Sequence, residues 1–163
     1  MEKVLLVIYG EGGHRTEMHR LLTLMNAAAV DLKIVSMGVQ AIGDNTLSGL
    51  ELAHYPIRDI RSKHSRVKNL LLLPIVFNAF LMVFKITRRY RIIGVISTGP
   101  GLAIVPMLSL RLMGVKGVYI ETFSRFHSRS FSGRVMSKLA DRFLVQNSEL
   151  QSLYPNSEYS GRL

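Results

Sequence analysis

Residues 91–125 read RIIGVISTGPGLAIVPMLSLRLMGVKGVYIETFSR, and this stretch decides the fold class of the chain. Its first part is an apolar run rich in β-branched residues, which breaks at the turn-forming residues 97–101. An almost wholly apolar segment then continues to Met113, Gly114 ends it, and a second apolar run leads into Glu121. The pattern predicts a strand, a loop, a helix and a second strand, which together have the length of a βαβ unit.

Polar residues gather where the two predicted strands end. Ser97 and Thr98 follow the first strand, and Glu121 and Thr122 follow the second. In an open parallel sheet, ligands bind in the crevice outside the carboxyl ends of the strands. We therefore expect the ligand site of this chain at that edge.

The rest of the chain alternates between strand-like and helix-like patterns. Strands are expected at 3–9, 32–37, 50–57 and 140–146, and helices from near Thr16 onward and at 132–139 and 148–153. This alternation predicts the α/β class with a mostly parallel sheet. No repeat and no linker rich in Gly, Ser or Pro interrupts the sequence, so residues 1–163 are expected to form a single Rossmann-like domain.

Composition removes several classes of site. The chain has no cysteine, which excludes a disulfide framework and a thiolate metal site. Its histidines lack ligand-like spacing to one another or to carboxylates, so no metal and no cofactor is expected. The apolar run at the N-terminus is too short for a signal-peptide core with its cleavage site, and it predicts a first buried strand.

Most of the positive charge lies in residues 58–91, where nine Lys or Arg face one acid, a net +8 of the +10 on the chain. Between the basic flanks, residues 69–84 carry no charge. This block is shorter than the ~20 residues of a membrane-spanning helix, so we expect a helix or helix pair in the membrane interface. A wholly buried core helix is the alternative. The basic residues expected to contact the membrane are Arg61, Lys63, Arg66, Lys68, Lys85, Arg88 and Arg89.

Two glycine loops follow predicted strands, one at residues 10–14 and one at residues 98–101. Glycines let backbone N–H groups approach an anion, and His14 stands at the tip of the first loop. A dinucleotide fingerprint would need glycine in place of Arg15, and the chain also lacks the Gly-Lys-Ser/Thr of a P-loop. Each loop alone could be an ordinary tight turn. Together, on two units of one sheet, they predict a pyrophosphate- or sugar-contacting site.

Glu121 ends a predicted buried strand, where an unpaired carboxylate is costly. It could act as a base, accept hydrogen bonds from sugar hydroxyls, or pair with Arg125 four residues later. Arg125 and Arg129 could meet phosphates or remain solvated loop cations. The sequence leaves these alternatives open.

Several separated motifs resemble one family. They are GEGGHRTEM at 10–18, STGPG at 97–101, ETFSR at 121–125, FSGR at 131–134, LADRFLVQ at 139–146 and the closing YP…YSGRL. The chain resembles the PssD/CpsF-type subunits of bacterial polysaccharide glycosyltransferases. That family also contains the membrane-anchoring subunit of the eukaryotic dolichol-linked GlcNAc transferase.

The resemblance implies half of a GT-B glycosyltransferase. This chain would supply the N-terminal, Rossmann-like half, and a PssE-like partner of about 150 residues, the size of one domain, would bind the UDP-sugar. The chain would be inactive without that partner. It would lie at the cytoplasmic face of the plasma (inner) membrane, peripheral or monotopic, attached through residues 58–91, and bind a polyprenyl-pyrophosphate-linked sugar.

The resemblance also implies roles for single residues. Gly12, Gly13, Thr98, Gly99 and Gly101 would face the pyrophosphate and first sugar of the acceptor. The segment 121–125, including Ser124 and Arg125, would line the cleft between the subunits. His14 and Glu121 are the candidates for the catalytic base.

Two other classes compete with this interpretation. A self-contained nucleotide-binding Rossmann protein would need the fingerprint that the sequence lacks. A nucleic-acid-binding protein would interleave aromatic residues with its basic ones, and residues 58–68 contain none. We therefore expect no nucleic-acid partner.

Overall fold

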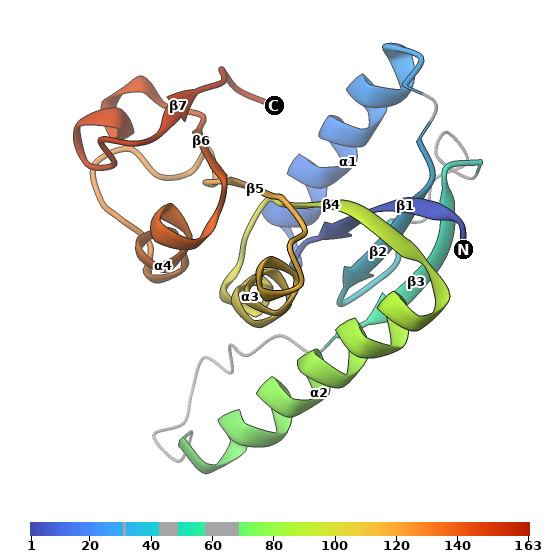
Figure 1. The fold of residues 1–163 in the computed structure, drawn as a ribbon. Helices are drawn as coiled ribbons and strands as arrows, with labels where there is room; N and C mark the ends of the chain where they lie inside the picture. Colours follow the sequence, from blue (N-terminus) through green and yellow to red (C-terminus); the bar gives the residue numbers. More distant parts are fainter. Residues whose placement is uncertain (31, 43–48, 58–68) are drawn as a thin grey trace.

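The computed structural model describes residues 1–30, 32–42, 49–57 and 69–163, which form one α/β domain around a parallel sheet (Figure 1). The sheet has seven strands in the order β3-β2-β1-β4-β5-β6-β7, and every neighbouring pair is parallel. The strands are β1 Lys3–Ile8, β2 Ile34–Gly38, β3 Glu51–Pro56, β4 Arg91–Ser97, β5 Gly117–Ile120, β6 Arg142–Val145 and β7 Glu158–Tyr159. The predicted fold class is confirmed.

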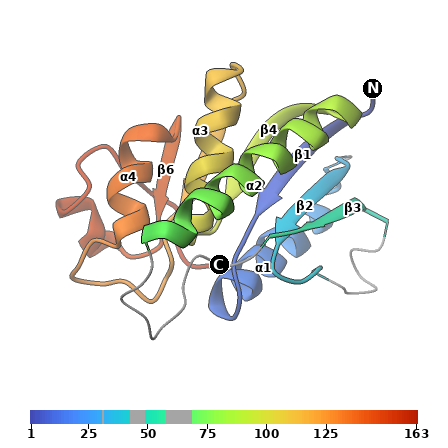
Figure 2. The ribbon, with the colours of Figure 1, turned by 90° about the horizontal axis from the view of Figure 1, so that it is seen from below.

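Helices cover both faces of the sheet. They are α1 Gly13–Ala27, α2 Asn69–Arg89, α3 Ile104–Leu112 and α4 Phe131–Leu139, with 3-10 turns η2 Gly101–Ala103 and η3 Ser148–Ser152. Helix α1 lies over one face, and α2, α3 and α4 lie over the other (Figures 1 and 2). We call these three helices the helix layer. Helices can pack on both faces of the sheet because successive side chains of a β-strand point to opposite faces.

The predicted uncharged block forms one helix, α2, which continues through Pro74. Its inner face buries Ala79, Val83 and Ile86 against the sheet, so this part of the helix packs as core. Its outer face leaves large apolar side chains exposed at helical spacing, namely Val76, Phe77, Phe80, Leu81 and Phe84. The alternative of a wholly buried core helix is therefore wrong.

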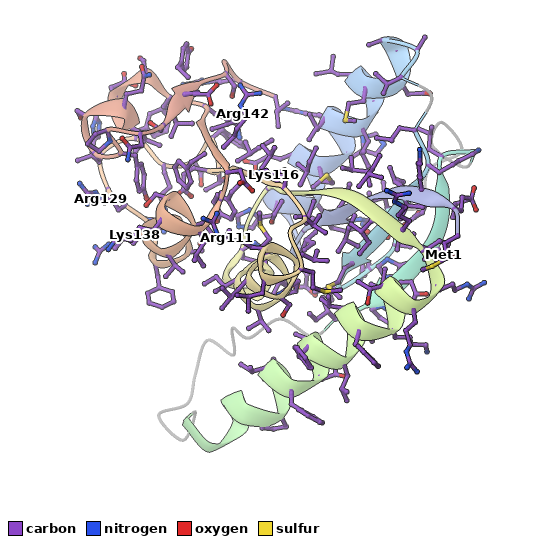
Figure 3. The ribbon with its side chains drawn as sticks, viewed as in Figure 1. Met1, Arg111, Lys116, Arg129, Lys138 and Arg142 are labelled. Atoms are coloured by element: carbon purple, nitrogen blue, oxygen red, sulfur yellow. The ribbon has the colours of Figure 1, made fainter. Side chains whose placement is uncertain are left out.

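Cations lie at the end of α2 and on other parts of the helix layer. Lys85, Arg88 and Arg89 are exposed at the end of α2, and the Arg88 guanidinium lies 4.7 Å from the centroid of the Phe84 ring. Arg111 and Lys138 project from the α3 and α4 parts of the helix layer (Figure 3). The predicted membrane contacts Arg61, Lys63, Arg66 and Lys68 lie outside the described residues. Among the described residues, no helix is long and apolar enough to cross a membrane.

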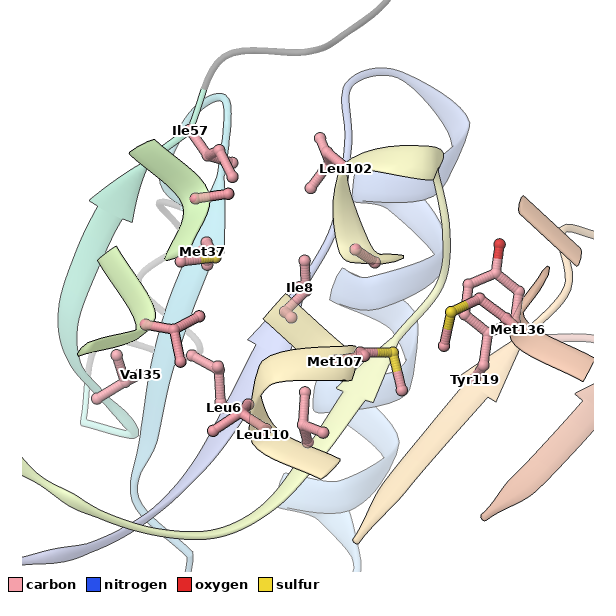
Figure 4. Close-up of a cluster of buried hydrophobic side chains, with 14 of the residues drawn as sticks. Leu6, Ile8, Val35, Met37, Ile57, Leu102, Met107, Leu110, Tyr119 and Met136 are labelled. Carbon is pink, nitrogen blue, oxygen red and sulfur yellow. The ribbon is translucent and has the colours of Figure 1, made fainter. Parts of the chain in front are cut away.

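The main core lies between the sheet and the helix layer. Leu6 and Ile8 of β1 meet Met107 and Leu110 of α3 there, and Met136 of α4 closes the far end (Figure 4). A second, smaller core packs the opposite side chains of β1 against α1. Both faces of β1 are thus buried, which explains why this strand reads as a near-continuous apolar run.

The strand order reverses beside β1, which pairs with β2 on one side and with β4 on the other. Ile8 at the end of β1 stands in register with Ser97 at the end of β4. The loops that leave these two strands therefore start next to each other, at the switch point where open α/β sheets bind ligands.

Candidate functional site

A cavity of about 380 Å³ opens at the carboxyl edge of the sheet, where the sequence predicts the ligand site. Both polar and apolar residues line it. The polar residues, termed the polar wall, are His14, Glu121, Thr122, Ser124, Arg125, Ser130 and Ser132. The apolar residues, termed the apolar wall, are Pro100, Leu102, Ile104, Val105 and Phe131, together with the backbone of Gly101. Both glycine loops and the segment after β5 thus contribute to one cavity.

Two hydrogen bonds between His14 and Thr98 connect the two glycine loops. The His14 Nδ1 atom lies 2.6 Å from the Thr98 carbonyl oxygen, and the Thr98 hydroxyl donates to the His14 carbonyl at 2.8 Å. A carbonyl oxygen only accepts, so Nδ1 carries the proton in this bond. In this tautomer the lone pair lies on Nε2, for which the described residues provide no hydrogen bond. His14 therefore presents a proton acceptor at the cavity.

The four glycines predicted to contact the ligand occupy three different kinds of position. Gly101 lines the cavity, and a Cβ added there would meet no atom within 4 Å. Gly99 is buried behind His14 with φ +87, and an added Cβ would lie 2.9 Å from the His14 ring. Gly12 and Gly13 lie at the start of α1, outside the residues that line the cavity. The structure thus brings Gly101 to the site, while Gly99 makes room for the histidine.

Thr98 likewise lies behind the cavity wall, since its side chain is fully buried under His14. Its hydrogen bonds with His14 fix the orientation of the imidazole ring. The expected contact of Thr98 with the acceptor, which the family resemblance implies, is not seen in this position of the side chain.

Glu121 is 2% exposed, and neighbouring donors occupy its carboxylate. Ser130 donates to it at 2.8 Å and Tyr154 at 3.1 Å, and the backbone N–H of Thr122 approaches at 3.3 Å. Burial, and after it the Glu121 charge, raise the pKa of Tyr154 to about 12, so the phenol stays protonated and donates. Ser130 also caps α4 through the Gly133 N–H, which places the carboxylate at a helix N-terminus.

This network makes Glu121 a support for the cavity wall. Its lone pairs are largely engaged, whereas a general base needs a free one. The alternative of an ion pair with Arg125 is also not what the structure contains, because the Arg125 guanidinium donates to the Ser128 hydroxyl at 3.2 Å. Of the two candidate bases, the geometry favours His14.

The loop after β5 carries Ser124 and Arg125 to the rim of the cavity. The Asn147 amide holds this loop by donating to the carbonyl oxygens of Phe123, at 2.7 Å, and Arg125. The Arg125 side chain is half-buried at this rim, and its guanidinium is the cation that would meet an anion there. Because η2 runs directly into α3 beside Gly101, a helix N-terminus also points at this rim. The anion-binding capacity of the site therefore lies between Gly101 and Arg125.

Glu17 is a residue that the sequence did not single out. Its side chain is 1% exposed, and Oε1 accepts from the Thr122 hydroxyl at 2.7 Å and from the Phe123 N–H at 3.0 Å. Burial raises the pKa of Glu17. The only signal in the sequence is its position, three residues after His14 on the same helix face. Among the described residues, no group of His, Cys, Asp or Glu side chains could hold a metal ion.

Comparison with known sequences gives a consistent set of relatives. A family described as "Oligosaccharide biosynthesis protein Alg14 like" matches residues 5–163. The UDP-N-acetylglucosamine transferase subunit ALG14 of Homo sapiens is 28% identical over 98% of this chain and 82% of its own length. The corresponding subunit of Mus musculus is 30% identical with the same coverage. That of Schizosaccharomyces pombe is 30% identical over 98% of this chain and 83% of its own.

Solved structures share the fold at low identity. MurG of Acinetobacter baumannii superposes with a TM-score of 0.62 at 15% identity, over 100% of this chain and 44% of its own. A UDP-N-acetylglucosamine 2-epimerase superposes with a TM-score of 0.66 at 12% identity, over 97% of this chain and 46% of its own. The chain therefore spans less than half of each of these proteins, in agreement with the predicted equivalence to half of a GT-B fold.

Proposed function

We propose that this chain, which belongs to the Alg14-like family of oligosaccharide biosynthesis proteins, is the acceptor-binding subunit of a two-subunit glycosyltransferase. The enzyme would transfer a sugar from UDP-GlcNAc or a related UDP-sugar to a sugar carried on a polyprenyl pyrophosphate. The names of the relatives support the transferase class and the nucleotide sugar. Within the family we propose the PssD/CpsF type, on the motifs that run through the chain.

One observation carries the proposal: a single cavity has a proton-accepting histidine, an anion-binding rim and an apolar wall. An acceptor of the proposed kind has the matching parts, which are a nucleophilic hydroxyl, a pyrophosphate and a hydrocarbon chain. His14 would take the hydroxyl proton, Gly101 and Arg125 would meet the pyrophosphate, and Phe131 would meet the first part of the chain. A dinucleotide cofactor fits less well, because the sequence lacks the dinucleotide fingerprint.

The donor site is proposed to come from a separate chain, a PssE-like subunit of about one domain. Transfer between two substrates needs both held in one geometry, and this chain forms one Rossmann-like unit. The relatives support a partner, since each is named as a transferase subunit. The partner would close over the carboxyl edge of the sheet and place the UDP-sugar opposite His14.

We also propose that the helix layer faces the cytoplasmic surface of the plasma membrane, with the protein held peripherally or monotopically. The exposed stripe of α2 supports this, because soluble surfaces rarely carry a contiguous row of large apolar side chains. Leu112 of α3, 81% exposed, and Phe131 of α4, 76% exposed, extend the apolar surface over the same layer. Phe131 also lines the cavity, so a membrane on this side would meet the apolar wall of the site.

Calorimetry on the isolated chain tests acceptor binding. A short-chain lipid-pyrophosphate GlcNAc should bind, and UDP-GlcNAc should not bind tightly. Gly101→Val should weaken acceptor binding about tenfold, because its side chain would stand where the pyrophosphate reaches the backbone.

Gly13→Ala is the matched control. An added Cβ at Gly13 also meets no atom within 4 Å, yet Gly13 lies outside the cavity lining. Acceptor affinity in this variant should stay within about twofold of wild type, a difference under 0.5 kcal/mol. Tight binding of UDP-GlcNAc by the isolated chain, without binding of the acceptor analogue, would overturn the assignment of the cavity.

A further inference from the structure

The Glu17 carboxylate has two oxygen atoms with very different surroundings. Oε1 accepts two hydrogen bonds from the Thr122–Phe123 turn. Oε2 is buried without a hydrogen-bond partner in the described part of the chain. A buried carboxylate oxygen without a donor costs free energy, so its retention calls for a partner at another step of the reaction.

The ionisable group that faces Oε2 is the His14 imidazole. The Oε2 atom lies 3.9 Å from His14 Nδ1, on the side of the ring away from the unpartnered Nε2. In the neutral ring, the Nδ1–H group donates a hydrogen bond to the Thr98 carbonyl, and Oε2 remains unpartnered. When Nε2 takes up a proton, which is the second proton of the ring, the imidazole becomes positively charged, and a buried carboxylate at this distance becomes its counter-ion.

We propose that Glu17 is a positioning residue for glycosyl transfer: Oε1 fixes the Thr122–Phe123 turn beside His14, and Oε2 stabilises the imidazolium that His14 becomes. In that step the acceptor hydroxyl gives its proton to Nε2. The oxygen forms the new bond to the anomeric carbon of the donor sugar, and the electron pair of the broken bond leaves with the nucleoside diphosphate. The inference rests on the proposed function for this step. The pairing between the two side chains rests on their geometry alone.

The other titratable groups around Glu17 cannot serve as the counter-ion of the charged His14 ring. Glu121 is engaged by Ser130 and Tyr154, and burial raises the pKa of Tyr119, so that this phenol stays neutral. No described cation lies within ion-pair distance of Glu17 apart from His14. The two residues therefore form a pair in which a proton on one favours the charge on the other.

An NMR titration of the His14 ring tests the pairing without any catalytic assay. Glu17→Gln keeps the side-chain shape and an oxygen that can accept from Thr122 and Phe123, but removes the charge. The ring should then bind its second proton less tightly than in wild type, because the counter-ion is gone. Glu158→Gln removes a carboxylate that pairs with Arg142 at the surface, and it should leave the titration unchanged.

Steady-state kinetics of the reconstituted complex supply the second measurement. Glu17→Gln should lower kcat at least tenfold, with the acceptor KM changed less than threefold, and should move the acidic limb of the pH profile to lower pH. Thr122→Val removes one bond of the turn and leaves the charge, so it should raise the acceptor KM and leave the His14 titration at its wild-type pH.

If the Glu17→Gln variant has the His14 titration and the kcat of wild type, Glu17 only holds the Thr122–Phe123 turn in place. That result would overturn the proposal. A wild-type complex without transferase activity would refute the proposed function instead. The titration would still decide whether Glu17 stabilises the charged ring. The melting temperature of each variant identifies any loss of folding.

Discussion

Removing the aromatic side chains from the exposed stripe of α2 should release the protein from membranes. The perturbation is the triple change of Phe77, Phe80 and Phe84 to Ser. Full burial of a phenylalanine contributes ~1.5–3 kcal/mol, and these side chains are 61%, 50% and 49% exposed, so about half of that remains to be gained from a membrane. Three such side chains amount to roughly 3 kcal/mol, which corresponds to about a 100-fold loss of binding.

Flotation with phospholipid vesicles measures this loss directly, with and without anionic lipid. The matched control replaces three exposed apolar residues outside the helix layer, Leu24, Val30 and Leu52, with Ser. The control should float as wild type does, and both variants should keep the wild-type melting temperature. Equal binding of the triple Phe variant and wild type, or equal loss in the control, would refute the assignment of the stripe to the membrane.

Three further changes test the site and the fold. Gly133→Ala should lower the free energy of unfolding by about 3 kcal/mol, because the new Cβ would lie 2.8 Å from the Ser130 hydroxyl and closer still to Glu121; an unchanged melting temperature would contradict this. Burial lowers the pKa of His54 below its ordinary 6.5, so the unfolded chain binds the proton first and stability should fall as the pH drops below about 6.5. In thermal melts, His54→Asn should reduce the dependence of the melting temperature on pH. The same pH dependence in the variant and in wild type would show that His54 is not its cause. His14→Gln should lower kcat of the assembled complex about 10²-fold with a smaller change in acceptor KM, and wild-type kcat would remove it as the base.

The sequence predicts the elements of this fold well where one periodicity dominates. The unit quoted from residues 91–125 forms as β4, η2, α3 and β5, because its apolar runs contribute Val95, Met107, Leu110 and Tyr119 to the main core. Helix α1 begins three residues earlier than the predicted Thr16, since Gly12 with φ 60 lets the chain turn directly into the helix. The short strand β7 is not predicted, because its two residues are exposed and have no apolar pattern.

The site is predicted less completely, for a physical reason. Loops after strands identify the edge where ligands bind, and His14, Gly101, Ser124 and Arg125 do meet there. Which loop residue faces the cavity depends on contacts across the chain, and Thr98 turns inward to hold His14, 84 residues away in sequence. Sequence spacing alone carries no information on such a contact.

The burial of Glu17 also depends on a contact across the chain that the sequence does not reveal. Its neighbour Met18 belongs to the predicted apolar face of α1, so a glutamate beside it reads as a solvated position. It is buried because the turn after β5 passes over α1 and supplies its donors.

A transfer assay with separated subunits tests the central claim most directly. Labelled UDP-GlcNAc and a lipid-pyrophosphate-linked sugar would be incubated with this chain alone, with its donor-binding partner alone, and with both. We expect product only when both chains are present, and tight binding of the UDP-sugar only in samples that contain the partner. Transfer by this chain alone, with tight donor binding, would contradict its assignment as the acceptor-binding half of the enzyme.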